Sequence, residues 1–174
     1  MTDANTANFR QVRAFALDVD GVLTDGGLWW GANGEEWKRF CFADIMGLSL
    51  ARRAGLALGL ISGENSALVD RYAAKMHIAF VVKNCRDKAS ALRDFAASAQ
   101  VEMREICYMG DDVNDLAAME IAGVSAAPSD AMREAREIAD IVTEKPGGNG
   151  AVREVVDVIL AAKNLNAREV LRRP

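Results

Sequence analysis

Two aspartates, Asp18 and Asp20, stand one residue apart at the end of an apolar segment in AFALDVDGVLTDG, residues 14–26. In an extended strand, residues two positions apart point to the same side, so both carboxylates face the same space. Neighbouring carboxylates repel each other, and both stay ionised only when a cation or another positive group lies beside them. The pair therefore predicts a positively charged ligand at the carboxyl end of a strand, where open parallel sheets bind their ligands.

A second acidic group, GDDVND at residues 110–115, also ends an apolar segment. It adds Asp111, Asp112 and Asp115 immediately before a predicted helix. Acidic groups at the ends of two parallel strands can converge on one edge of the sheet. A few carboxylates with room for water and a substrate phosphate are the environment that Mg²⁺ prefers. We therefore expect a Mg²⁺ site at this edge.

Two further features favour a phosphate beside that cation. The stretch ISGENS, residues 61–66, places Ser62 and Gly63 between a strand and a helix, where backbone N–H groups attract anions. Lys88 opens the helix that follows the third strand, so its ammonium can reach the same edge. Each feature is common alone: an Asp-x-Asp sequence is often a turn, and a lysine is usually solvated. All four features, the two acidic groups, the loop at Ser62 and Lys88, occur at successive strand ends, and together they indicate phosphate chemistry.

The elements that must position these residues alternate along the chain. Short apolar segments predict strands, and helix-period segments between them predict helices. The predicted strands are residues 15–20, 56–63, 79–83, 105–111, 123–128 and 140–144, and helices are predicted over 65–78, 87–100 and 150–164. This order predicts an α/β fold of the Rossmann type, a parallel sheet with helices on both faces. We expect a single domain over residues 1–174.

One segment interrupts the alternation. Residues 26–40 contain two aromatic or mixed runs around the turn sequence GANG, which predicts a β-hairpin inserted after the first strand. Trp29, Trp30 and Trp37 give this hairpin more apolar surface than it can bury alone. They either fold back onto the domain or form a subunit interface. Residues 164–174 are basic and predict either a mobile tail or a docking arm.

Composition excludes several classes of function. The 174 residues are 51% hydrophobic and 26% charged with a net charge of −4, which argues against nucleic acid as the main partner. No apolar run is long enough to span a membrane, and MTDANTANFRQ lacks the apolar region of a signal peptide. Three cysteines without close spacing argue against disulfides and zinc. We expect a cytoplasmic protein that binds neither nucleic acid nor membrane.

The four motifs together resemble those of the haloacid dehalogenase superfamily. DVDGVLTDG is similar to its first motif, LISG to its second, Lys88 to its third and GDDVND to its fourth. The resemblance implies that Asp18 is the nucleophile, which takes up the phosphoryl group as an aspartyl phosphate. It also implies that Asp20 is the general acid and then the general base. Ser62 and Lys88 would hold the phosphoryl oxygens.

The same resemblance implies a ligand set for Mg²⁺. The ion would be bound by Asp18, by the backbone carbonyl of Asp20 and by Asp111. Asp112 and Asp115 would surround these ligands without binding the ion directly. The chemistry would be mostly positioning and charge neutralisation, as phosphoryl transfer requires.

The chain resembles one group within the superfamily. Most members carry a cap domain, but only the hairpin follows the first motif here and residues 62–88 are too few for a second domain. DGVLTDGGLWWGANGEEWKRFCFADIMGL and KPGGNGAVREV resemble phosphatases of 3-deoxy-2-keto sugar acid phosphates. The resemblance implies a phosphorylated sugar acid as substrate and a capless homotetramer, with the tryptophans at its interfaces.

Two substrates remain open within that group, 3-deoxy-D-manno-octulosonate 8-phosphate and 2-keto-3-deoxy-nononate 9-phosphate. Octulosonate enzymes have a basic residue after the Ser-Gly of the second motif, where this chain has Glu64. Glu64 with Lys75 on the same predicted helix resembles the nononate enzymes, although both residues could also belong to a solvated helix face. Gly147, Gly148 and Arg153 are weaker candidates for substrate contacts.

Two other classes of protein share some of these features. Response-regulator receiver domains are also small α/β chains with an acidic cluster, Mg²⁺ and a phosphorylated aspartate. Their acceptor aspartate lies near the middle of the chain, and they have no counterpart of Asp20. A non-catalytic scaffold built around the tryptophan hairpin is the third interpretation, and the undegraded acidic motifs argue against it.

Overall fold

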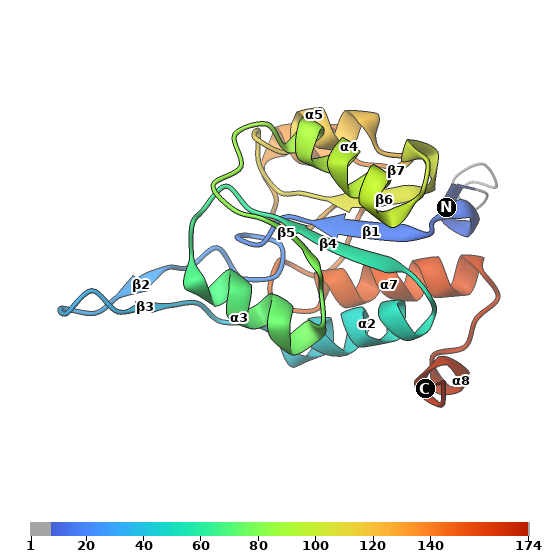
Figure 1. The fold of residues 1–174 in the computed structure, drawn as a ribbon, viewed down its shortest axis with the longest axis horizontal. Coiled ribbons are helices and arrows are strands. Elements are labelled where there is room, and N and C mark those ends of the chain that lie inside the picture. The colour runs from blue at the N-terminus through green and yellow to red at the C-terminus, as the bar shows by residue number, and fades with distance from the viewer. Residues whose placement is uncertain (1–7, 174) are drawn as a thin grey trace.

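A six-stranded sheet forms the centre of the computed structural model, which describes residues 8–173 (Figure 1). The strand order is β5-β4-β1-β6-β7-β8, and every neighbouring pair is parallel. The strands are β1 (Ala14–Leu17), β4 (Ala57–Ile61), β5 (Phe80–Val82), β6 (Ile106–Met109), β7 (Val124–Ala127) and β8 (Ile141–Val142). All six predicted strands are present, each shorter than its apolar segment because the polar ends belong to loops.

Helices cover both faces of this sheet, as predicted. In Figure 1, α2, α3 and α7 lie on one side, and α4, α5 and α6 lie on the other. The helices are α2 (Phe42–Arg53), α3 (Ala67–Met76), α4 (Lys88–Ala99), α5 (Leu116–Ile121), α6 (Arg133–Ile138), α7 (Ala151–Ala162) and α8 (Ala167–Leu171), with a short 3₁₀ helix at Met103–Glu105. Within residues 8–173 no cap domain is inserted between these elements, in agreement with the prediction.

Strand β1 is buried on both faces because it lies in the middle of the sheet. Phe15 and Leu17 join the core under α2, α3 and α7, whereas Ala14 and Ala16 join the core under α4, α5 and α6. This alternation is the period of two that a strand imposes on its side chains. It fixes the register of β1, and with it the direction in which the next residue, Asp18, points.

Helix α2 was not predicted, and its contacts explain why it forms. It packs against α7, and a methyl group on Gly47 would lie 2.9 Å from the Cα atom of Arg153. The buried carboxylate of Asp44 accepts the backbone N–H groups of Gly150 and Arg153, each at 3.0 Å. These are otherwise unpaired donors in the first turn of α7, so Asp44 caps that helix from a distance.

The predicted hairpin is present and projects away from the sheet (Figure 1). It consists of β2 (Trp29–Trp30) and β3 (Glu36–Trp37), paired antiparallel with Trp29 opposite Trp37. Of the two possibilities for its tryptophans, burial by folding back onto the domain is wrong. Trp29, Trp30 and Trp37 remain 69%, 75% and 51% exposed in the single chain.

The C-terminal residues dock on the domain instead of forming a mobile tail. Helix α8 packs against α2, and Val170 is fully buried. The Arg53 guanidinium also donates hydrogen bonds to the carbonyl groups of Leu171 and Arg173. Pro174, the last residue of the predicted tail, lies outside the described residues. Within the described part of the chain, no helix has the length and apolarity needed to cross a membrane.

Candidate active site

The acidic motifs meet at the carboxyl edge of the sheet. Strands β1 and β6 are neighbours, with Leu17 opposite Met109, and the Asp18 N–H donates to the Met109 carbonyl at 3.0 Å. This pairing brings the residues after both strands together. Carboxylate oxygens of Asp18, Asp111 and Asp115 lie within 4.8 Å of one another. The predicted convergence of the two motifs is therefore what the structure shows.

Lys88, the first residue of α4, lies in the middle of this group. Its ammonium is 3.0 Å from Asp18 Oδ1 and 2.7 Å from Asp115 Oδ1, and only 1% of its side chain is exposed. A lysine this deeply buried needs such partners, because an unpaired charge in the interior is strongly unfavourable. Lys88 is therefore not a solvated surface lysine.

Asp115 supports the site without facing its opening. It is fully buried and accepts hydrogen bonds from Lys88 and from the Tyr108 hydroxyl, the latter at 2.6 Å. Its second oxygen accepts the N–H groups of Asp111 and Asp112 at 3.1 and 3.3 Å. With these donors Asp115 orients Lys88 and shapes the 110–115 loop. Its geometry fits the predicted supporting role better than that of a metal ligand.

The pKa values of the carboxyl groups reflect their burial first and the surplus of negative charge around them second. The pKa of Asp18 is raised to about 7, chiefly by burial; the Lys88 ammonium offsets part of this rise and the Asp115 carboxylate adds to it. Burial, followed by the charges of Asp18 and Asp115, raises the pKa of Asp111 to about 8. Burial lowers the pKa of Lys88, but the two carboxylates beside it more than compensate, so its net shift is upward. One lysine does not balance these carboxylates, and the oxygen donors of Asp18 and Asp111 fit a hard divalent cation.

A cleft of about 340 Å³ opens above these groups. Its walls carry carboxylates from three loops together with small and polar residues: Asp18, Asp20, Gly21, Gly26, Gly63, Glu64, Asp111, Asp112, Asn114 and Met132. Gly21 has a left-handed φ of +83°, and a methyl group there would lie 2.0 Å from Asp111 Oδ2. Only glycine lets the loop after β1 pass so close to that carboxylate.

The second motif reaches the same cleft through its backbone. Ser62, the residue after β4, is fully buried, and its hydroxyl accepts the Glu64 N–H at 3.1 Å. Gly63 and Glu64 line the cleft. Helix α3 begins only at Ala67, with Ser66 as its N-cap. The prediction that Glu64 lies on the same helix as Lys75 is therefore wrong, because Glu64 belongs to the preceding loop.

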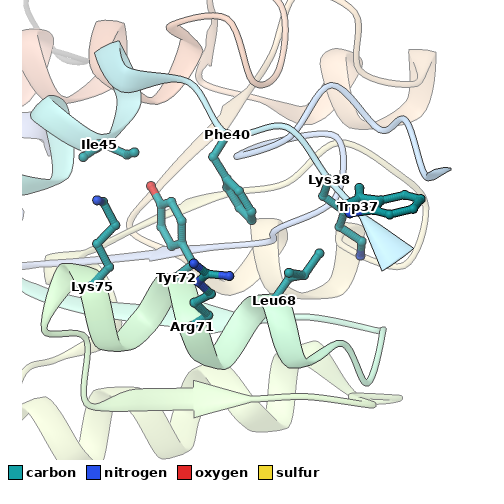
Figure 2. Close-up of a pocket in the computed structure, with 8 residues that line it drawn as sticks. All are labelled: Trp37, Lys38, Phe40, Ile45, Leu68, Arg71, Tyr72 and Lys75. Carbon is teal, nitrogen blue, oxygen red and sulfur yellow. The ribbon is translucent and has the colours of Figure 1, made fainter. Parts of the chain in front are cut away.

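Lys75 lies at a different cavity. Figure 2 shows it in a pocket of about 290 Å³ between α3 and residues 37–45. Phe40 and Tyr72 stack in that pocket with ring centroids 4.5 Å apart. The structure thus does not bring Glu64 and Lys75 to one cavity in the single chain. A role for Lys75 in substrate binding stays a prediction.

The weaker candidates near the C-terminus lie beside the loop after β1. A methyl group on Gly147 would lie 1.8 Å from the Gly21 carbonyl oxygen, so this glycine permits close backbone packing. The Gly148 N–H donates to the Val22 carbonyl at 2.9 Å. Arg153 donates to Asp157 at 2.9 and 3.0 Å and does not line the cleft. Substrate contact by these residues stays a prediction.

Lys38 was not among the predicted site residues. Its ammonium lies 2.8 Å from Asp20 Oδ1 and 2.9 Å from Oδ2, and 3% of its side chain is exposed. Lys38 follows the second strand of the hairpin, and no spacing rule relates it to Asp20. A basic residue two positions after Glu36 is a weak signal that could not have identified this contact.

Comparisons with known proteins show the family to which the chain belongs. The family profile described as haloacid dehalogenase-like hydrolase matches residues 61–155. The 3-deoxy-D-manno-octulosonate 8-phosphate phosphatase KdsC of Escherichia coli K12 is 36% identical over 157 residues, covering 90% of this chain and 84% of that protein. The chain belongs to the haloacid dehalogenase-like hydrolase family. Membership of this family rules out the receiver-domain interpretation.

Solved structures of family members extend the similarity to the fold. The Moraxella catarrhalis octulosonate 8-phosphate phosphatase, crystallised with magnesium ion, phosphate ion and KDO, is 35% identical with a TM-score of 0.91 and covers 94% of each chain. The cobalt-bound form of the Haemophilus influenzae enzyme is 34% identical with a TM-score of 0.88, covering 90% of this chain and 92% of that one. The capless fold is therefore shared with phosphatases of this family.

Proposed function

We propose that the protein is a Mg²⁺-dependent phosphatase that hydrolyses 3-deoxy-D-manno-octulosonate 8-phosphate through an aspartyl phosphate. The observation that carries this proposal is the convergence of Asp18 and Asp111 at one open cleft, with Lys88 buried against Asp18. The names of the family members described above supply the substrate. Asp18, Asp111 and the backbone carbonyl of Asp20 would hold Mg²⁺, which supplies positive charge to the phosphoryl oxygens.

The first step forms the aspartyl phosphate. An Asp18 carboxylate oxygen attacks phosphorus while the bond from phosphorus to the sugar oxygen breaks. Asp20, which lines the same cleft, gives a proton to the departing sugar oxygen. Lys88 lies against Asp18 and attracts the phosphoryl oxygens, and the loop at Ser62 and Gly63 offers backbone N–H groups. Asp115 keeps Lys88 in place.

The second step releases inorganic phosphate. Asp20, now ionised, takes a proton from water as the water oxygen attacks phosphorus and the bond to Asp18 breaks. Both steps require Asp20 within reach of the atoms around phosphorus. They leave the enzyme as it began, with a free Asp18 carboxylate and a protonated Asp20.

The nononate ester is the second candidate substrate, and Glu64 is the observation that favours it. Glu64 places a carboxylate at the cleft, at the position where the resemblance to octulosonate enzymes leads us to expect a basic residue. A carboxylate there accepts hydrogen bonds from substrate hydroxyl groups and repels a substrate carboxylate. The geometry of the single chain favours neither ester, whereas the names of the relatives favour the octulosonate.

A side-by-side assay of the two esters tests the substrate. We expect kcat/KM for octulosonate 8-phosphate to exceed that for nononate 9-phosphate by at least about tenfold, since one good hydrogen bond or methylene can contribute that much. Phosphate release would be followed at equal enzyme concentration with Mg²⁺ present. The reverse preference would make the nononate ester the substrate. If neither ester is hydrolysed, the result would support the non-catalytic scaffold instead.

A homotetramer is also part of the proposal, with the hairpin at its interfaces. Trp29 and Trp30 are the most exposed tryptophans, and apolar surface of this kind commonly marks an interface. We expect sedimentation to give four times the chain mass, and the double variant Trp29→Ser, Trp30→Ser to give smaller species. A wild-type monomer at micromolar concentration would contradict the tetramer. The cytoplasmic location and the absence of nucleic-acid binding stay predictions.

A further inference from the structure

We infer that Lys38 is a positioning residue that fixes the orientation of the Asp20 carboxylate for proton transfer, so that the hairpin is part of the catalytic apparatus. This inference rests on the proposed function, because it concerns the residue to which that function assigns acid and base catalysis. It assigns to the hairpin a second role besides association.

The contact between Lys38 and Asp20 involves both carboxylate oxygens. The Lys38 ammonium lies within 2.9 Å of both oxygens of Asp20, which restricts rotation of the carboxylate about its last bond. The Asp20 side chain is still 30% exposed and lines the cleft, so it remains accessible to a substrate. The Lys38 side chain, at 3% exposure, is itself immobilised. The contact to both oxygens belongs to ionised Asp20, the form that acts as general base; protonated Asp20 keeps the contact through its other oxygen, and small displacements of a catalytic group are costly.

The lysine is in turn held by the base of the hairpin. Glu36 Oε1 lies 3.8 Å from the Lys38 ammonium and accepts a hydrogen bond from the Ser66 hydroxyl at 2.6 Å. Ser66 is the N-cap of α3, so the hairpin is connected to a rigid helix. Figure 2 shows Lys38 beside Trp37 at one end of the pocket that α3 lines.

Arg39, the next residue, holds the hairpin by different contacts. It donates to Asp25 Oδ2 at 3.0 Å and to the Gly148 carbonyl at 3.1 Å, and it also bonds the Asn149 side chain. Arg39 therefore attaches the same segment to the domain without contacting Asp20. Variants of the two residues can therefore be compared. Lys38 contacts both the hairpin and Asp20, whereas Arg39 attaches the hairpin segment without touching Asp20.

The test compares two esters that differ in their need for a general acid. A sugar phosphate releases an alkoxide that must be protonated, whereas p-nitrophenyl phosphate releases a stable phenolate that leaves without a proton. We expect Lys38→Met to lower kcat/KM for the sugar-acid phosphate on the order of 100-fold, in the range of general acid catalysis. The rate of the first p-nitrophenol burst should change by less than about threefold. Lys38→Arg should recover most of the loss.

Arg39→Met is the matched control. It loosens the hairpin but leaves the Lys38 contact, so both esters should be affected to the same extent. Equal losses for both esters in Lys38→Met would overturn the inference, as would a rise in KM with unchanged kcat, which indicates direct substrate binding. If the wild-type protein hydrolyses neither ester, the proposed function itself is wrong, and that result is distinct from equal losses in an active enzyme.

Discussion

Replacing Asp18 with asparagine should lower kcat by at least about a thousandfold while the protein remains folded. Nucleophilic catalysis is lost because an amide oxygen does not form the phosphoryl intermediate, and such losses are typically of this size or larger. The measurement is phosphate release from the sugar-acid ester at saturating substrate. A single-turnover experiment should show no phosphorylated protein.

The fold should survive because asparagine has nearly the same shape as aspartate. Asp18 is 5% exposed, and burial already disfavours its ionised form in the metal-free protein. Lys88 keeps its contact with Asp115 at 2.7 Å, so its ammonium is not left unpaired. We therefore expect a circular dichroism spectrum like that of the wild type and a change in Tm of only a few degrees.

Asp94→Asn is the control for this variant. Asp94 is exposed on α4, six residues after Lys88, and its loss should leave kcat unchanged. Turnover by Asp18→Asn near the wild-type rate would exclude the aspartyl-phosphate mechanism. A trace of activity that grows with storage would indicate deamidation of the new asparagine, and mass spectrometry would identify it.

The strands could be predicted from sequence because parallel strands at the centre of an α/β sheet are buried on both faces. That environment demands continuous apolar segments such as AFAL in β1, and the polar residues that follow must be at an edge. The order of the acidic motifs then predicted their convergence. The segment 15–20 was predicted as strand, but β1 ends at Leu17 because Asp18, Asp20 and Gly21 belong to the loop that lines the cleft.

The residues that were missed depend on packing between distant segments. Helix α2 contains Gly47, a poor helix former, so its own sequence is a weak helix signal. The glycine is needed because the helix packs closely against Arg153 of α7. Lys38 reaches Asp20 only because the chain, after the second strand of the hairpin, comes back to the loop that follows β1. Lys75 was paired with Glu64 on one predicted helix from the resemblance to the nononate enzymes, but α3 begins at Ala67, so Glu64 lies in the loop before it. Local pattern determines each element, whereas these contacts depend on how elements meet.

Removal of Mg²⁺ should abolish turnover reversibly, and the affinity for the ion should rise with pH. In the metal-free protein the pKa of Asp18 is raised to about 7 and that of Asp111 to about 8, chiefly by burial. Protons therefore compete with the cation below these values. We expect the Mg²⁺ dissociation constant to fall at least about tenfold between about pH 6 and pH 8, with release of protons on binding.

Stability should show the opposite trend in the metal-free protein. Both carboxyl groups have folded-state pKa values above their ordinary value of 3.8, so the folded protein binds more protons than the unfolded chain between that value and about pH 8. The unfolding free energy must then decrease as pH rises through this window. Saturating Mg²⁺ should weaken or reverse this dependence, because the ion binds the ionised carboxylates of the folded state.

Calorimetric titration with Mg²⁺ in two buffers of different ionisation enthalpy measures the released protons, and thermal unfolding with chelator or Mg²⁺ measures the stability. Asp111→Asn should bind the ion more weakly by at least about tenfold and release fewer protons, since it lacks one of the two competing carboxyl groups. Asp94→Asn should behave as the wild type. Mg²⁺ affinity that is independent of pH, in wild type and Asp111→Asn alike, would mean that the ion binds away from the carboxylates at the ends of β1 and β6. The chemistry proposed for Asp18 would then lack the positive charge it needs. The single ammonium of Lys88 is already shared between the carboxylates of Asp18 and Asp115.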